Sequence, residues 1–363
     1  MKHKILHVLI SPRAEGTPRL VLDWLKNTEI EQRILFLNST PIDLFSEFER
    51  TGNKIYSFDI GNDKFRKFIE IGKVLPKVLD EFSPDLLIAW PQSLAGAIIW
   101  SIGSRKIKSI IHIGCYPFYN SWFQIFYNYF VYFPIILKNG KFICASEFLL
   151  KRISLLPGIP KRKVKKIYNA INLERFIKGL NKNDFSERKG AIMVSNLESF
   201  KNQSFLIDVW HELKRKGYDY HLTFVGGGSM RQELENKVKS KGLGDLILFT
   251  GPVGNVAELL SHHKLFIFPT APTEGFGTVI IEALAAGCKV IANDTPACTE
   301  LLENGKWGTL IEYLNLERYA EEIILSINSN ILAYDYNDLK EYLDQFSINQ
   351  MIKGYLEISD LSF

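Results

Sequence analysis

The sequence predicts an α/β protein with two doubly wound parallel domains in tandem. Its 363 residues are enough for two domains of roughly 150–200 residues each. Short apolar runs alternate with helical patterns along the chain, which is typical of parallel sheets covered by helices. A polar, charged stretch at residues 181–189, NKNDFSERK, divides this alternation into two series.

The apolar runs predict a strand at each point where they lie between helical patterns. In the first series the expected strands are Ile5–Ile10, Arg33–Leu37, Lys54–Phe58, Leu86–Trp90, Ile110–Ile113, Phe142–Ala145 and Val164–Tyr168. Expected helices between them include Arg19–Asn27, Lys64–Phe82 and Ser146–Leu156. In the second series the expected strands are Gly190–Ser195, His221–Val225, Leu246–Thr250, Leu265–Pro269, Lys289–Ala292 and Thr309–Ile311. Apolar and charged residues interleave from Asn337 to Ser359, which predicts a helical tail.

These elements predict an N-terminal domain at residues 1–180, a second domain at 181–345 and a C-terminal helix within 346–363. We expect that helix to pack toward the N-terminal domain. Open α/β sheets bind ligands at the carboxyl ends of their strands. Two such domains facing a central cleft would suit an enzyme with two substrates.

Cysteine usage and hydropathy exclude several classes of protein. The four cysteines are far apart and form no CxxC motif, which argues against a disulfide framework or a zinc site and suits a reducing compartment. The N-terminal MKHKILHVLISP resembles a signal peptide, but its apolar run is short and ends in Ser-Pro, so we expect a first strand. No apolar run reaches about 18 residues, so no membrane span is predicted.

Charge is distributed unevenly along the chain. Residues 1–180 carry 27 Lys and Arg against 15 Asp and Glu, and residues 181–363 carry 17 against 25. This asymmetry predicts a charged partner for the first half. The basic segment also holds Tyr116–Phe133, with eleven aromatic residues. That run predicts either buried helices or a peripheral contact with an anionic membrane, and no recognition module favours nucleic acid.

The segment PTAPTEGFGTVIIEALAAG, residues 269–287, is the most informative in the chain. A strand, a glycine turn and a helix follow one another, an order that presents backbone N–H groups to an anion. Glu274 lies on the turn, and Glu282 lies about two helical turns further on, where a buried carboxylate needs a partner. The pair predicts a ligand with hydroxyls and phosphate. The alternative is that Glu274 only stabilises the helix N-terminus by its charge and that Glu282 is a surface residue of the helix.

Lys201 and the run Gly226–Gly228 extend this prediction. A lysine near a helix start is electrostatically unfavourable for the helix, so Lys201 is a candidate ligand for an anion. The glycine run has Arg231 where the third glycine of a dinucleotide fingerprint would stand. It therefore predicts a close-packed turn between strand and helix, near a nucleotide.

Five ordered segments resemble the retaining nucleotide-sugar glycosyltransferases of family 4, which have the GT-B architecture of two Rossmann-like domains. The similar segments are KVKKIYNAINLERF, SNLESFKNQSFLI, HLTFVGGGSMRQEL, LFTGPVGNVAELLSHHKLFIFPT with the glutamate-pair segment, and NDTPACTELLENGKWGTLI. The resemblance covers about residues 140–345 well and the N-terminal domain weakly.

The resemblance implies a role for each matching residue. Glu282 would accept hydrogen bonds from the ribose, Glu274 would contact the transferred sugar, and Lys201 would neutralise the diphosphate. The other donor-binding positions would be Gly275, Phe276, Gly277, Thr278, Gly16, Thr17, Asn196, Gly227 and Arg231. The acceptor side would hold His112, Cys115, Tyr116 and Trp122. No metal and no cofactor would be required, because the nucleotide sugar is a co-substrate.

Three positions depart from the family pattern. Asn196 stands where an arginine is usual, so one charge at the diphosphate is missing unless Arg231 replaces it. His112 lies inside a predicted strand, and Gly114-Cys115 stand where the family often carries a histidine. Thr17-Pro18 replaces a second glycine in the N-terminal loop.

The resemblance implies a retaining hexosyltransferase that moves a sugar from a UDP- or GDP-linked donor to a glycan or lipid-linked acceptor. The expected setting is synthesis of cell-envelope polysaccharide or lipopolysaccharide, in the cytoplasm or at the inner face of the plasma membrane. The alternative is a catalytically weakened homologue that binds nucleotide sugar or glycan as a partner subunit. An NAD-dependent oxidoreductase is excluded by the lack of an N-terminal GxGxxG and of a Tyr-x-x-x-Lys pair.

Overall fold

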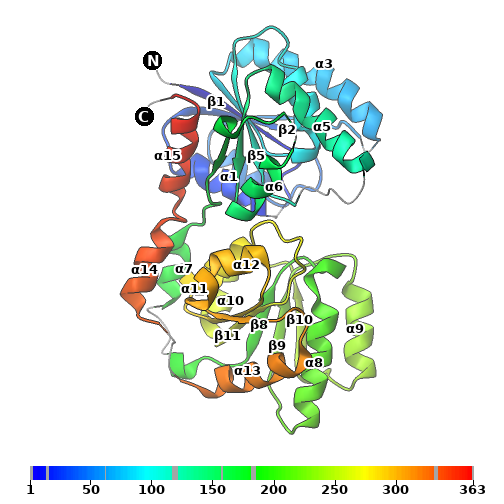
Figure 1. Ribbon diagram of the computed structural model, residues 1–363, viewed down its shortest axis with the longest axis vertical. Coiled ribbons are helices and arrows are strands. Elements are labelled where there is room, and N and C mark those ends of the chain that lie inside the picture. The colour runs from blue at the N-terminus through cyan, green and yellow to red at the C-terminus, as the bar shows by residue number, and fades with distance from the viewer. Residues whose placement is uncertain are drawn as a thin grey trace. The chain divides into compact units, whose positions relative to one another are not determined.

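The computed structural model describes residues 3–13, 16–61, 63–116, 122–156, 158–180, 185–330 and 334–361. The chain forms two compact units (Figure 1). The first comprises Met1–Ala170 with Ile348–Phe363, and the second comprises Ile171–Ser347. The C-terminal segment therefore belongs to the N-terminal unit.

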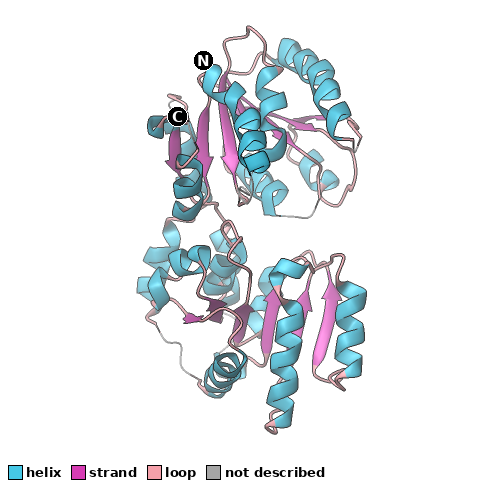
Figure 2. Cartoon of the chain, turned by 45° about the vertical axis from the view of Figure 1, so that its right-hand side comes forward, coloured by secondary structure: helices cyan, strands magenta, loops and turns pink. Residues whose placement is uncertain are grey.

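The first unit is built on a parallel sheet with the strand order β3-β2-β1-β4-β5-β6-β7. Its strands are β1 (Lys4–Leu9), β2 (Glu31–Phe36), β3 (Lys54–Ser57), β4 (Leu86–Ala89), β5 (Lys108–Ile113), β6 (Lys141–Cys144) and β7 (Val164–Lys166). The strands predicted for this half are confirmed, with small differences at their ends. The central strands are apolar on both faces because helices cover both faces of a parallel sheet (Figure 2).

Helices pack on this sheet in two groups. They are α1 (Gly16–Lys26), α2 (Phe45–Glu49), α3 (Lys64–Phe82), α4 (Ala95–Trp100), α5 (Trp122–Leu137), α6 (Glu147–Ser154) and α15 (Ile348–Ile358). Helix α4 packs against both α3 and α5, whereas α1 packs against α15. Asp63 caps α3 by accepting the N–H of Arg66 at 2.8 Å, which explains where that predicted helix begins.

The second unit is built on a parallel sheet with the strand order β10-β9-β8-β11-β12-β13. Its strands are β8 (Ala191–Val194), β9 (Leu222–Val225), β10 (Ile247–Gly251), β11 (Leu265–Phe268), β12 (Lys289–Asn293) and β13 (Thr309–Ile311). They match the six predicted strands. In both sheets the order reverses beside the first strand, between β1 and β4 and between β8 and β11. Such a switch point is where open α/β sheets bind ligands.

Eight helices of the second unit lie within its described residues. They are α7 (Leu173–Leu180), α8 (Gln203–Arg215), α9 (Arg231–Ser240), α10 (Val256–His262), α11 (Thr278–Ala285), α12 (Pro296–Leu301), α13 (Leu316–Asn328) and α14 (Tyr336–Asp344). Single 3₁₀ turns lie at Gln92–Leu94, Lys161–Lys163, Phe185–Glu187, Ser199–Lys201 and Glu303–Gly305. The predicted helical tail is two helices, because α14 packs on α11 of the second unit and α15 packs on α1 of the first.

The division between the units differs from the boundary placed at residue 180 from the sequence. Helix α7 packs against α10 and α11 and so belongs to the second unit. The polar stretch at residues 181–189 reads as a linker in the sequence, and its residues 181–184 lie outside the described residues. The rest of it is partly structural, since Arg188 is buried and donates from Nη1 to the carbonyl of Ala286 at 2.8 Å. Polar composition alone does not distinguish such an anchor from a linker.

Across the part of the chain that the structure describes, no helix combines the length and the apolar character that crossing a membrane requires.

Candidate functional site

Lys201 and Glu274 follow the two strands between which the order of the second sheet reverses. Strand β8 leads to the 3₁₀ turn Ser199–Lys201, and β11 leads to the turn that carries Glu274. The carboxyl ends of neighbouring parallel strands lie at one edge of the sheet. The topology therefore brings together two side chains that are 73 positions apart.

The two side chains form an ion pair. Lys201 Nζ donates to Glu274 Oε2, and the hydroxyl of Thr270 donates to the same oxygen at 3.2 Å. Each side chain of the pair is only 14% exposed. The Lys201 ammonium also lies 5.0 Å from the ring centres of Phe200 and Phe268. The site thus holds one cation and one carboxylate, both partly removed from water, where charge interactions are stronger than in bulk solvent.

Asn202 fixes the turn that carries the lysine. Its backbone is left-handed, with φ +59°, a conformation that asparagine tolerates better than most residues. Its side-chain amide donates to the carbonyl of Pro269 at 2.7 Å and to the hydroxyl of Tyr313 at 3.2 Å. These bonds tie the turn after β8 to the ends of β11 and β13. The sequence prediction missed this residue, although an asparagine between a 3₁₀ turn and a helix is a signal for it.

Gly277 positions the N-terminus of α11 beside the ion pair. Its φ of +82° favours glycine, and a Cβ there would lie 3.2 Å from the ring of Phe268 and 3.8 Å from Glu274 Cγ. Gly277 is the N-cap residue and has no side chain to cap the helix. The N–H groups of its first turn, which begins at Thr278, therefore point toward the region next to Glu274, as an anion would require. Phe276, just before, is buried and anchors the turn.

Glu282 lies in the second turn of α11. Its side chain is half-buried, whereas the neighbouring Ile281 and Ala283 are fully buried. The helix thus holds Glu282 at the margin of its apolar face and Glu274 just ahead of its N-terminus. This arrangement agrees with a carboxylate that is reachable by a ligand, and the ribose role stays a prediction.

Asn293 is a buried residue that the sequence prediction missed. Its Nδ2 donates to the carbonyl of Thr270 at 3.1 Å, and its Oδ1 accepts from the hydroxyl of Tyr319 at 2.8 Å. Thr270 in turn bonds Glu274. Asn293 therefore positions the segment that carries the ion pair, and its only sequence signal is an amide at the end of an apolar strand.

Two further donor-side positions do not contact the ion pair. Asn196 is exposed and carries no charge, and its carbonyl accepts from the buried Gln203 at 2.9 Å. Arg231 pairs with Glu235 at 2.7 Å and donates to the carbonyl of Phe249 at 3.4 Å. The guanidinium thus lies at the end of β10, where its charge is already compensated.

The run Gly226–Gly228 is a close-packed turn, as the sequence predicts. A Cβ on Gly226, whose φ is +134°, would lie 2.1 Å from the carbonyl oxygen of Ser195. The carbonyl of Gly227 accepts from the N–H of Leu197 at 2.8 Å. Glycine is therefore needed here for packing of the two turns, whatever ligand lies nearby.

The N-terminal candidates lie in the first unit. Gly16 and Thr17 begin α1, and a Cβ on Gly16 would meet nothing within 4 Å, so packing does not require glycine there. His112 is 2% exposed on β5, with Nδ1 2.8 Å from the hydroxyl of Tyr355. Burial lowers the pKa of His112 to about 4, so its ring is a neutral core group near pH 7.

The remaining acceptor-side candidates follow β5. Cys115 is exposed. The ring of Tyr116 stacks on Phe148 at 5.5 Å, and its hydroxyl accepts from Arg152. Trp122 begins α5, and its side chain lies outside the described residues. No group of three His, Cys, Asp or Glu side chains that could hold a metal ion lies within the described ranges.

The second unit is similar to known proteins. Residues 177–345 match the family model of the glycosyl transferases group 1. The chain is 29% identical over 171 residues to an uncharacterized glycosyltransferase of Haemophilus influenzae, covering 47% of this chain and 48% of the relative. It is 30% identical over 182 residues to the N-acetylgalactosamine-N,N'-diacetylbacillosaminyl-diphospho-undecaprenol 4-alpha-N-acetylgalactosaminyltransferase of Campylobacter jejuni, covering 50% and 47%. The chain thus spans about half the length of these relatives.

The whole chain resembles a solved structure. It superimposes on HepE of Anabaena, crystallised with UDP and glucose, with a TM-score of 0.77 and 18% identity, covering 98% of this chain and 99% of that one. The two sheets, of seven and six parallel strands, are those of the GT-B fold.

Proposed function

We propose that this chain, which has the GT-B fold and matches the glycosyl transferases group 1 over residues 177–345, transfers a hexose from a nucleotide diphosphate sugar to an acceptor hydroxyl with retention at the anomeric carbon. One observation carries the proposal. The fold pairs Lys201 with Glu274 at the switch point of the second sheet, beside the uncapped N-terminus of α11. A cation, a carboxylate and the N–H groups at a helix N-terminus suit the diphosphate and the hydroxyls of such a donor.

The reaction follows from the charges at this site. The bond between the anomeric carbon and the diphosphate oxygen breaks, and negative charge develops on that oxygen. Lys201 and the N-terminus of α11 stabilise this charge. When Lys201 pairs with the diphosphate, its ion pair with Glu274 breaks. The Glu274 carboxylate can then accept hydrogen bonds from the sugar hydroxyls. The acceptor oxygen bonds to the anomeric carbon on the face that the nucleotide leaves, and its proton passes to the departing phosphate. No metal is needed in this scheme.

The relatives support the substrate classes. HepE was crystallised with UDP and glucose, which favours a UDP-linked donor over a GDP-linked one. The Campylobacter enzyme is named for a diphospho-undecaprenol-linked acceptor, which favours a glycan or lipid-linked acceptor in cell-envelope polysaccharide or lipopolysaccharide synthesis.

An acceptor of this kind suits a peripheral contact of the first unit with the cytoplasmic face of an anionic membrane. Helices α4 and α5 pack together and expose large apolar side chains: Trp100 is 65%, Phe126 70% and Leu137 59% exposed. The sequence around them, from residue 105 to residue 178, is basic. Apolar anchors among basic residues support interfacial binding.

Nucleotide release tests the proposed transfer. The protein is incubated with UDP- and GDP-linked hexoses and with an acceptor mixture of lipid-linked glycans, and released nucleotide is measured. We expect release by the wild type and a loss of at least a hundredfold in Glu274→Gln. Glu233→Gln, an exposed substitution on α9, is the matched control. Release that is equal in both variants would refute the role of Glu274. The configuration of the product, read by NMR, decides retention.

Asn196 supports a second candidate function. Because its amide brings no charge where an arginine is usual, the chain could bind a nucleotide sugar as a non-catalytic partner subunit. Calorimetric binding of UDP-glucose without nucleotide release, in the wild type and in Glu274→Gln alike, favours this function. Asn196→Arg then tests the missing charge, because restored release means that only this cation was lacking.

A further inference from the structure

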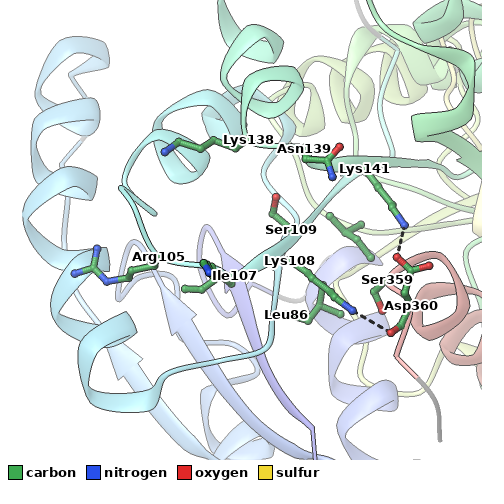
Figure 3. A pocket seen from close by; sticks show the side chains of 12 residues that line it. Leu86, Arg105, Ile107, Lys108, Ser109, Lys138, Asn139, Lys141, Ser359 and Asp360 are labelled. Carbon is green, nitrogen blue, oxygen red and sulfur yellow. Dashed lines mark hydrogen bonds and ion pairs between the residues drawn. The ribbon is translucent and has the colours of Figure 1, made fainter.

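A depression of about 370 Å³ lies at the amino-terminal ends of β4, β5 and β6 in the first unit (Figure 3). Its walls come from the segment that leads into β5, the turn before β6 and the residues after α15. The acceptor-side candidates lie at or after the opposite end of β5. That strand has six residues, which span roughly 16–20 Å. The depression is therefore separate from these acceptor-side candidates.

Five cations and one carboxylate line this depression. The carboxylate is Asp360, and the cations are Arg105, Lys106, Lys108, Lys138 and Lys141. The Arg105 guanidinium is already paired, because Nε and Nη2 each donate to Asp80 at 2.8 Å. The four lysines outnumber the single carboxylate, so the depression keeps an excess of positive charge.

Ser109 adds an unpaired polar group to the same wall. Its side chain is only 5% exposed and lines the depression (Figure 3). Among the described residues its hydroxyl has no hydrogen-bond partner. A buried hydroxyl without a partner is destabilising. The oxygen is shielded from solvent as it stands, so an oxygen-rich anion in the depression accepts its hydrogen bond once the side chain turns toward it.

Asp360 already occupies part of the space as an anion. Lys141 Nζ lies 3.0 Å from its Oδ2, and Lys108 Nζ donates to its backbone carbonyl at 2.9 Å (Figure 3). The Asp360 side chain is 76% exposed, so this ion pair is weak. Lys141 also donates to the carbonyl of Ile358, and Lys138 donates to that of Gly103. Each ammonium has three N–H donors, so at least one donor of each lysine remains for a ligand. An anion with more charge than one carboxylate can displace Asp360.

We propose that this depression binds a compact phosphate-bearing anion, a phosphomonoester or a diphosphate, through Lys106, Lys108, Lys138, Lys141 and the hydroxyl of Ser109. Lysine ammonium groups act as point charges and suit the tetrahedral oxygens of phosphate, whereas the one arginine fork is committed to Asp80. The size of the depression fits one such group. Two sources share this chemistry, a soluble phosphate compound and the headgroup of an anionic phospholipid. The site does not depend on the proposed transferase function.

Calorimetric titration with inorganic pyrophosphate tests the soluble source. The full chain carries Lys201→Ala, so that the cation of the donor site is absent from every sample. We expect binding that weakens at least tenfold when Lys108→Ala and Lys138→Ala are added. Lys151→Ala with Lys161→Ala removes the same charge elsewhere in the first unit and is the matched control, expected to bind as before. Asp360→Ala is expected to bind at least twofold more tightly.

Flotation with vesicles tests the headgroup source. Vesicles of phosphatidylcholine with and without phosphatidylglycerol are mixed with the same proteins, whose folding is checked by circular dichroism. Binding to phosphatidylglycerol that only the Lys108/Lys138 variant loses, without pyrophosphate binding, assigns the site to a lipid headgroup. The proposal is overturned if this variant matches the Lys151/Lys161 control in both experiments, or if Asp360→Ala weakens pyrophosphate binding.

Discussion

We expect two buried histidines to make the stability of the first unit depend on pH. Trp90 Nε1 donates to His7 Nδ1 at 3.2 Å, so His7 Nε2 carries the proton and donates to Gln32 Oε1 at 2.8 Å. A second proton on His7 would sit on Nδ1 and meet the Nε1–H of Trp90, so two donors would face each other. Burial lowers the pKa of His7 to about 4, although the bond to Gln32 opposes the shift. Burial also lowers the pKa of His112 to about 4.

The size of the effect follows from these values. Below pH 6.5 both histidines bind a proton in the unfolded chain, whereas in the folded unit they stay neutral until the pH approaches 4. The free energy of unfolding therefore falls as the pH drops from 6.5 toward 4. Above pH 6.5 both states are neutral at these positions and the contribution is complete. At pH 5 the loss is about 2 kcal/mol for each histidine and about 4 kcal/mol for both. That is a large part of the roughly 5–15 kcal/mol that stabilises a typical domain.

Urea unfolding at pH 7.5 and pH 5 measures this loss. Hydrogen exchange of peptides that span β1 and β5, corrected for the pH dependence of intrinsic exchange, reports the first unit alone. His7→Gln should be less stable at pH 7.5 but should lose about 2 kcal/mol less on acidification than the wild type. His7→Gln combined with His112→Gln should remove most of the pH dependence. The reasoning is refuted if the wild type is equally stable at both pH values.

Three further predictions concern the second unit. Lys201→Ala should lower nucleotide release by about 10²–10³-fold, the usual cost of removing one group that stabilises developing negative charge, whereas Lys239→Ala on α9 should leave it unchanged. Gly277→Ala should lower stability by about 1–2 kcal/mol in urea unfolding, because its φ of +82° is left-handed; equal stability would contradict the strain. Asn293→Ala should cost about 1–3 kcal/mol, since it leaves the buried hydroxyl of Tyr319 without its acceptor, and Asn293→Asp should recover part of that loss. An unchanged melting temperature for Asn293→Ala would show that the amide does not organise the site.

The sequence predicts the strands well because each one is a short apolar run buried on both faces. Leu86–Ala89 and Leu265–Phe268 are examples in which every residue is buried. The division between the units was less predictable. Arg188 looks like part of a polar linker, and only its bond to Ala286 shows that the segment is anchored. The helical pattern after residue 336 likewise does not reveal that α14 and α15 pack in different units.

The candidate site also has some features that the sequence predicts and others that it does not. The glycine turn at Gly277, and glutamates before and within α11, are local patterns that a sequence displays directly. The close packing at Gly226 was also predictable, because consecutive glycines between a strand and a helix are typical of a turn that another backbone approaches closely. In contrast, Arg231 was a candidate replacement for the charge missing at Asn196, and the structure commits it to Glu235 instead. A contact with a residue four positions away competes with any distant ligand, and sequence alone does not rank the two.

By itself the sequence determined the alternation of strands and helices and the residue types around the turn at Glu274, since both depend on periodicity and on local backbone geometry. Only the tertiary structure decided that Lys201 meets Glu274 and that Asn202 and Asn293 hold the turns that carry them. These contacts join strands that are adjacent in the sheet but distant in the chain. Strand order is set by how a whole unit buries its apolar surface, which no single segment encodes.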